Sequence, residues 1–308
     1  MKYLLSKSLM GLALSVLFAA TVQAQPKIAA SIRPVHALVS AVMGETGSPA
    51  LILGGNTSPH NMALKPSQQR TIEGAGIIFH IGGGLEGQLE KPLKRRKASG
   101  AEIVTLIEAP DLTLLPIRES SIWPHGEHSG DDDHGIHDPH IWLDPLNARA
   151  MTLHIADVLA KADPANAATY LSNARRFGDE LDKLQTRIAA RLAPVRARPF
   201  IIFHDGYQYF EKRFALNAAG AIAADPDKRP GARRLRDIRQ VIAERNALCV
   251  FAEPQFDISY VTTVIEGTAA RTAQLDPIGT TLKSGTNAYI TMMTTMADNI
   301  AGCLAADP

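Results

Sequence analysis

The sequence has little net charge, few cysteines and only one long apolar run. It also lacks the common motifs of hydrolytic enzymes. Its 32 Lys and Arg residues nearly balance its 31 Asp and Glu residues, which argues against a surface for nucleic acid or anionic membranes. Neither HExxH nor Gly-x-Ser-x-Gly occurs in the chain, so two common signatures of hydrolytic enzymes are missing.

The one long apolar run lies at the N-terminus. Two lysines precede an apolar segment at 9–20, and small residues at 22–24 provide a cleavage site, which is the pattern of a secretory signal. The apolar segment is shorter than the roughly 20 residues of a membrane-spanning helix. We therefore expect residues 1–24 to be a cleaved signal peptide. The mature protein is expected to begin near Gln25, in the periplasm and without direct membrane insertion.

Only two cysteines are present, Cys249 and Cys303. In an exported protein the simplest expectation is that they pair. Closing a loop of this length would stabilise the fold by roughly 4 kcal/mol on the chain-entropy model. A shared zinc ion is the alternative role, but neither cysteine is near a histidine in the sequence. We therefore expect a disulfide.

Short apolar segments alternate with segments of helical periodicity throughout the mature chain, which predicts parallel sheets covered by helices. Strands are expected at 27–32, 50–54, 76–81, 102–107, 199–203, 216–223, 248–252 and 272–275. Helices are expected at 34–44, 68–73, 85–93, 147–161, 163–194, 207–214, 232–245, 258–269 and 286–304. The expected fold class is α/β, with two lobes, each a mostly parallel sheet flanked by helices, joined by one long helix.

The helix expected at 163–194 is the longest periodic segment of the chain. A helix of about 30 residues is about 45 Å long, which favours a rigid connector over a helix in the core of one small domain. The expected organisation is a signal peptide at 1–24, an N-terminal lobe at 25–162, the linking helix at 163–194 and a C-terminal lobe at 195–308.

A histidine-rich stretch at 123–138 has the composition of a metal-binding loop. No apolar residue occurs between Trp123 and Ile136, so the stretch cannot bury enough surface to order itself, and we expect a solvated loop. Its imidazoles, interleaved with carboxylates, are ligands that zinc prefers. A solubilising insertion is the alternative. The histidines expected to bind secondary, weaker zinc ions are His125, His128, His134 and His137.

Four other ligand-type residues follow an apolar strand or turn: His60, His140, His204 and Asp276. In open α/β sheets, ligands bind outside the carboxyl ends of the strands. Three imidazoles and one oxygen form a suitable tetrahedral zinc set, which predicts a metal site between the lobes. Glu253 also ends a strand, where it is expected to orient a ligating imidazole. The histidines expected to be structural are His36, His80 and His154.

Several motifs, in order along nearly the whole mature chain, resemble the ABC-transporter solute-binding family, specifically its periplasmic zinc-binding, ZnuA-like group. The resemblance is carried by Ser58-Pro59-His60 with Leu64-Lys65-Pro66-Ser67, Asp138-Pro139-His140-Ile141-Trp142-Leu143-Asp144-Pro145, Phe203-His204-Asp205-Gly206-Tyr207-Gln208-Tyr209-Phe210, Phe251-Ala252-Glu253-Pro254-Gln255-Phe256 and Leu275-Asp276-Pro277-Ile278-Gly279.

The resemblance implies a monomeric, non-enzymatic protein that captures Zn²⁺ as transported ligand and delivers it to a membrane permease. It assigns ligand roles to His60, His140 and His204. Some zinc-binding relatives carry an acidic residue just before the first histidine, whereas this chain has Pro59. The fourth ligand is therefore either Asp276 or water. Alternatives are a manganese-binding protein of the same family, or an exported zinc-dependent hydrolase.

Overall fold

A computed structural model describes residues 26–56, 58–60, 63–118, 137–223, 226 and 228–305. Within these residues the strands form two four-stranded sheets, and every strand pair is parallel. The first has the order β2-β1-β3-β4, from β1 (Ile28–Ala30), β2 (Ala50–Leu51), β3 (Ile77–His80) and β4 (Glu102–Thr105). The second has the order β6-β5-β7-β8, from β5 (Phe200–His204), β6 (Ala218–Ala223), β7 (Cys249–Ala252) and β8 (Arg271–Gln274).

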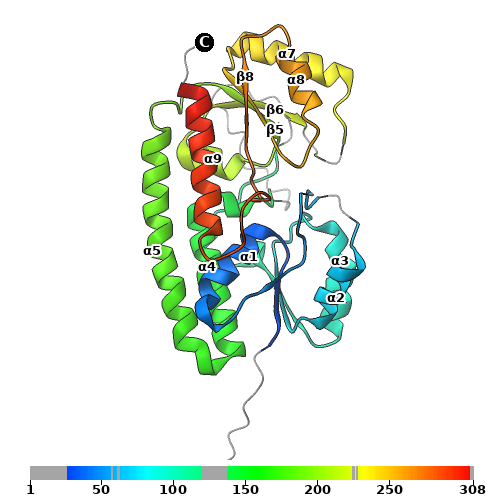
Figure 1. Cartoon of the computed structure of the whole chain (residues 1–308), viewed down its shortest axis with the longest axis vertical. Coiled ribbons are helices and arrows are strands. Elements are labelled where there is room, and N and C mark those ends of the chain that lie inside the picture. Colours follow the sequence, from blue (N-terminus) through cyan, green and yellow to red (C-terminus); the bar gives the residue numbers. More distant parts are fainter. Residues whose placement is uncertain are drawn as a thin grey trace, which may run out of the picture.

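Helices cover both sheets, as parallel strands require, because each strand must return through a crossover connection. In Figure 1 the two sheets lie one above the other, with helices on both sides of each. The α-helices are α1 (Arg33–Met43), α2 (Pro66–Gly74), α3 (Glu90–Ala98), α4 (Pro145–Ala162), α5 (Ala167–Leu192), α6 (Gln208–Phe214), α7 (Ala232–Arg245), α8 (Ser259–Ile265) and α9 (Ala288–Ala305). The 3-10 turns are η1 (Gly44–Thr46), η2 (Gly87–Leu89), η3 (Leu106–Glu108), η4 (Ile141–Leu143) and η5 (Pro164–Asn166).

The expected long helix between the lobes is confirmed as α5. Its 26 residues give it a length of about 39 Å, and it runs along one side of the molecule from the lower to the upper lobe (Figure 1). Tyr170, Phe177, Leu184 and Leu192 form its buried stripe. Helix α9 runs beside it, so both lobes share one helical layer.

The main hydrophobic core is continuous between the lobes. It joins residues of both sheets with α1, α4, α5 and α9, whereas a smaller core fills the other face of the second sheet beneath α7 and α8. Cys249 of β7 and Cys303 of α9 form the expected disulfide, with their Cα atoms 6.3 Å apart. None of the helices in the described part of the chain is both long and apolar enough to cross a membrane.

Two expected helix starts are wrong, and proline explains the first. The helix expected at 85–93 would place Pro92 in its interior, where the ring clashes with the preceding turn. Helix α3 instead begins at Glu90, so that Pro92 falls in its first turn. The long helix was expected to begin at Asp163. The Asp163 carboxylate accepts hydrogen bonds from the side chains of Asn166 and Tyr170, and α5 instead begins after the turn η5.

Candidate metal centre

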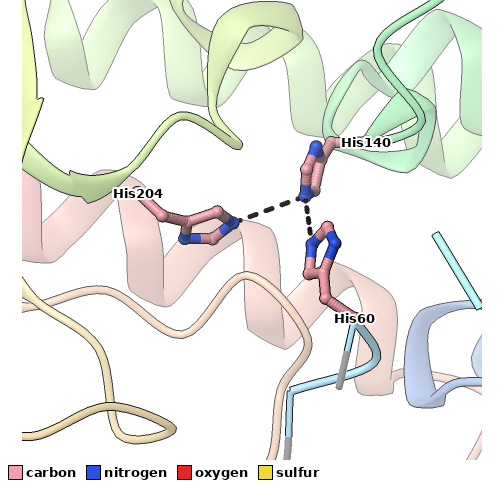
Figure 2. A group of neighbouring side chains, drawn as sticks. All are labelled: His60, His140 and His204. Carbon is pink, nitrogen blue, oxygen red and sulfur yellow. Dashed lines mark hydrogen bonds between the residues drawn. The ribbon is translucent and has the colours of Figure 1, made fainter. Parts of the chain in front are cut away.

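Three histidines from distant parts of the chain meet between the two sheets. His60 lies in the connection between β2 and α2, His140 directly precedes η4, and His204 is the last residue of β5. Figure 2 shows the three rings pointing toward one another. The carboxyl ends of parallel strands share one edge of a sheet, and the two sheets turn these edges toward each other, so the sequence positions of the histidines place them in one cleft.

The ring nitrogens of the cluster are close enough to share one ion. The Nε2 atom of His140 lies 3.2 Å from that of His60 and 3.4 Å from that of His204. One ring nitrogen from each histidine lies within 4.8 Å of those of the other two. For zinc–nitrogen bonds of 2.0–2.1 Å, a tetrahedral edge measures about 3.3–3.4 Å. The two separations from His140 therefore already match the edge that a tetrahedral ion requires.

Asp138 fixes the orientation of His140. Its carboxylate accepts a hydrogen bond from Nδ1 of the ring at 2.7 Å and another from the backbone N–H of His140 at 2.9 Å. With the proton on Nδ1, the lone pair of Nε2 is free and faces the cluster. The Trp142 ring packs beside His140, and its indole N–H donates to the Pro277 carbonyl in the other lobe.

Glu253 plays the same part for His204. Its Oε1 atom lies 2.6 Å from Nδ1 of His204. His204 is the last residue of β5, and Glu253 directly follows the neighbouring strand β7. Both are buried, with 4% of His204 and 3% of Glu253 exposed. Phe256 packs against the imidazole. The sequence expectation placed Glu253 near a ligating imidazole, and the structure places it against His204.

Burial and charge act differently on the three rings. Burial, followed by the proximity of His140 and His204, lowers the pKa of His60 to about 2. His60 is therefore neutral at physiological pH, as ligation requires. Burial also disfavours a charge on His204, but the Glu253 carboxylate more than offsets it, so the pKa of His204 is raised.

Asp276 lies beyond the cluster. Its Oδ1 atom accepts a hydrogen bond from Gln255 at 2.9 Å, and its Oδ2 atom accepts bonds from the hydroxyl of Thr280 and the backbone of Thr281. Both carboxylate oxygens therefore have partners other than the three-histidine cluster. Gln255, together with Pro277 and Ile278, lines the cleft next to the histidines.

The remaining histidines lie outside this cluster. His36 contacts the Pro49 carbonyl at 3.0 Å, and His80 contacts the Thr105 hydroxyl at 3.1 Å, consistent with structural roles. His154 lies on α4, half-buried. Three loop histidines that the sequence singled out lie outside the described residues, and these are His125, His128 and His134. His137 is described, and it forms a single bridge with Pro116.

Sequence reasoning missed the part played by Asp138, and it missed the ion pairs around Arg118. The Asp138-Pro139-His140 sequence carried a usable signal, because an Asp side chain commonly bonds the backbone two residues on. Arg118 pairs with Asp205 at 2.8 Å and with Glu211 at 2.5 Å. These partners are far away in sequence, so no local pattern indicates them. Arg118 precedes the histidine-rich stretch and pairs with the neighbour of His204, whereas Asp138 ends the stretch and contacts His140.

The fold and the cluster together define a class: a two-lobed binding protein whose lobes bring imidazoles together around a small cleft. The comparisons with known proteins then place the chain in a family. Residues 28–303 match the model of the family described as ZnuA, zinc-uptake complex component A, periplasmic. The chain belongs to this family.

Individual relatives agree with this placement. The chain is 41% identical over 306 residues to the high-affinity zinc uptake system protein ZnuA of Brucella suis biovar 1 (strain 1330), covering 90% of this chain and 91% of the relative. A crystal structure of ZnuA is similar with a TM-score of 0.76 and 25% identity, over 91% of this chain and 99% of that one. A ZnuA deletion mutant with zinc bound gives a TM-score of 0.76 and 26% identity, over 92% and 99%.

Proposed function

We propose that this protein captures Zn²⁺ between its lobes through Nε2 of His60, His140 and His204. The observation that carries the proposal is the spacing of these atoms. The separations of 3.2 and 3.4 Å from His140 match the edge of about 3.3–3.4 Å expected for tetrahedral zinc. Hydrogen-bonded carboxylates hold two of the rings in the tautomer that presents Nε2, which is the usual support of a metal-binding imidazole.

The donor set favours zinc over manganese. Three neutral imidazoles suit zinc, whereas manganese prefers oxygen donors. The similar zinc uptake protein of Brucella suis and the zinc-bound ZnuA deletion mutant support the same choice. The fourth position is taken by water or by Asp276. For Asp276 to bind, its side chain would have to give up hydrogen bonds with Gln255 and Thr280, so we favour water.

The bound ion is cargo, and the protein acts as a carrier without catalytic activity. It is exported by residues 1–24, matures near Gln25, and delivers zinc to the permease of an ABC transporter as a monomer. The proposed units are an N-terminal lobe at 25–162, a linking helix at 163–194 and a C-terminal lobe at 195–308. The family description as a periplasmic zinc-uptake component supports this role.

The histidine-rich segment is proposed to bind additional zinc more weakly. Its proposed ligands are His125, His128, His134 and His137. Arg118, which precedes the segment, pairs with the neighbour of His204, and Asp138, the last residue of the segment, holds His140. Zinc held here would be close to the cleft, so the segment would raise the local concentration of the cargo.

Zinc titration of the untagged protein tests the proposal. The wild type should bind one equivalent tightly, and His140→Ala or His204→Ala should each lower that affinity by orders of magnitude, because only two imidazoles remain. His154→Ala is the matched control, since this histidine lies outside the cluster. A wild type without tight zinc binding, or cluster variants that titrate like the wild type, would refute the assignment. Removing residues 126–136 should abolish only the weaker equivalents.

A further inference from the structure

Gly206 lies against the nitrogens of the three-histidine cluster. A Cβ atom built at this position would be 2.4 Å from Nε2 of His204 and 3.0 Å from Nε2 of His140. Real Cβ atoms essentially never come as close to another heavy atom as the 2.4 Å to His204, and a 3.0 Å approach such as that to His140 is rare. The space beside the two proposed ligand atoms therefore exists only because residue 206 has no side chain.

The glycine is required for its size and not for its backbone freedom. The φ angle of Gly206 lies outside the left-handed region that strains other residues, so alanine could adopt the same backbone conformation. Its backbone N–H donates to the carbonyl of His204 at 2.9 Å, which folds the chain back over the imidazole. The short turn brings the Cα of residue 206 next to the ring.

The His204 ring has no easy way to move aside. Glu253 holds its Nδ1 at 2.6 Å, and Phe256 and Tyr207 pack against the imidazole. Only 4% of His204 is exposed. A methyl group at residue 206 must therefore turn the ring away from Glu253 or push the backbone out of the cleft, and a well-packed interior resists both.

We propose that Gly206 is a positioning residue for the metal, keeping the space around Nε2 of His204 and His140 open for a bare divalent ion with short metal–nitrogen bonds. This inference rests on the proposed three-histidine zinc site. Gly206→Ala should lower zinc affinity by about 100-fold or more. This is the upper end of the loss in metal affinity, roughly 10–100-fold, that follows when a residue orienting a metal ligand is replaced.

The experiment compares Gly206→Ala with Gly302→Ala by zinc competition against a chromophoric chelator. Gly302 lies in α9 with nothing within 4 Å of an added Cβ, so its variant should bind zinc like the wild type. Circular dichroism and thermal unfolding of the metal-free proteins establish that each variant is folded. A folded Gly206→Ala protein with wild-type zinc affinity would overturn the inference while leaving the zinc site itself intact.

A second comparison separates a steric clash from general misfolding. In a His204→Ala background the closest contact is gone, so adding Gly206→Ala should lower the unfolding temperature of the metal-free protein much less than it does in the wild type. If the alanine destabilises the protein equally with and without the ring, the inference is wrong, whether or not the single variant folds. Failure of the proposed function would be seen separately, as a wild type that does not bind zinc or a His204→Ala protein that binds it fully.

Discussion

Replacing Glu253 by glutamine should weaken zinc binding without unfolding the protein. The Glu253 carboxylate accepts the Nδ1–H bond of His204 at 2.6 Å in a buried position. Glutamine has nearly the same shape and can still accept this bond through its amide oxygen, but it carries no charge. The substitution therefore removes the charge that makes the ligating imidazole more basic, while the packing stays almost unchanged.

The expected loss of zinc affinity is about 10–100-fold, the usual effect of removing an outer partner of a metal-binding histidine. It corresponds to about 1.4–2.7 kcal/mol of binding free energy. The loss should depend on pH. Zinc must displace the proton from His204, whose pKa is raised by Glu253 against the opposing effect of burial. In the variant that pKa falls, so proton competition weakens. The difference between the two proteins should therefore be largest at high pH and shrink as the pH falls.

Competition titrations at several pH values between 6 and 9 would measure this, and calorimetry in buffers of different ionisation enthalpy would count the protons released. Glu266→Gln is the matched control, because this side chain is 80% exposed and makes only a 3.8 Å contact with Arg239. An affinity ratio that does not change with pH, or that widens as the pH falls, would refute the reasoning about the proton on His204. An unchanged affinity at every pH would refute the orienting role of Glu253.

Three further predictions concern stability. Replacing Cys249 and Cys303 together by serine should lower the free energy of unfolding by about 4 kcal/mol on the chain-entropy model, as measured by denaturant titration, and an unchanged midpoint would contradict it. Ala215 has a φ of 52°, so Ala215→Gly should raise the free energy of unfolding by about 0.5–1 kcal/mol; a loss in the same titration would refute the assigned strain. Burial lowers the pKa of His36 in the folded protein, so below about pH 6.5 the imidazole is protonated mainly in the unfolded chain, which destabilises the fold. Between pH 7 and 5 the metal-free His36→Gln protein should therefore lose less free energy of unfolding than the metal-free wild type.

The sequence could predict that His60, His140 and His204 meet, because their positions follow a local rule. An apolar strand such as the one ending at His204 is recognised from a few neighbouring residues, and parallel sheets then place all strand ends at one edge. The long helix was predictable for a similar reason, since its apolar stripe repeats over many turns. Both inferences need only short-range periodicity and a general rule of sheet topology.

What the sequence could not predict depends on contacts between distant residues. Arg118 meets Glu211 across 93 positions, and Trp142 donates to Pro277 across 135. Nothing in the residues around Arg118 or Trp142 specifies these partners. The start of α3 was missed for another reason. Apolar residues before Pro92 have helical spacing, which suggests a helix that begins earlier. Proline is tolerated only in the first turn of a helix, so α3 begins at Glu90.

The three histidines are supported unequally, and this follows from how each lobe is built. His140 receives its carboxylate from a residue two positions earlier, and His204 receives its carboxylate from the adjacent strand. Among the described residues, no carboxylate lies within hydrogen-bond distance of the His60 ring, and His60 is also the most exposed of the three. Two of the three proposed ligands are thus held in place by carboxylates. The third, His60, comes from the connection between β2 and α2, and its ring contacts the other two imidazoles instead of a carboxylate, so its orientation is the least constrained of the three.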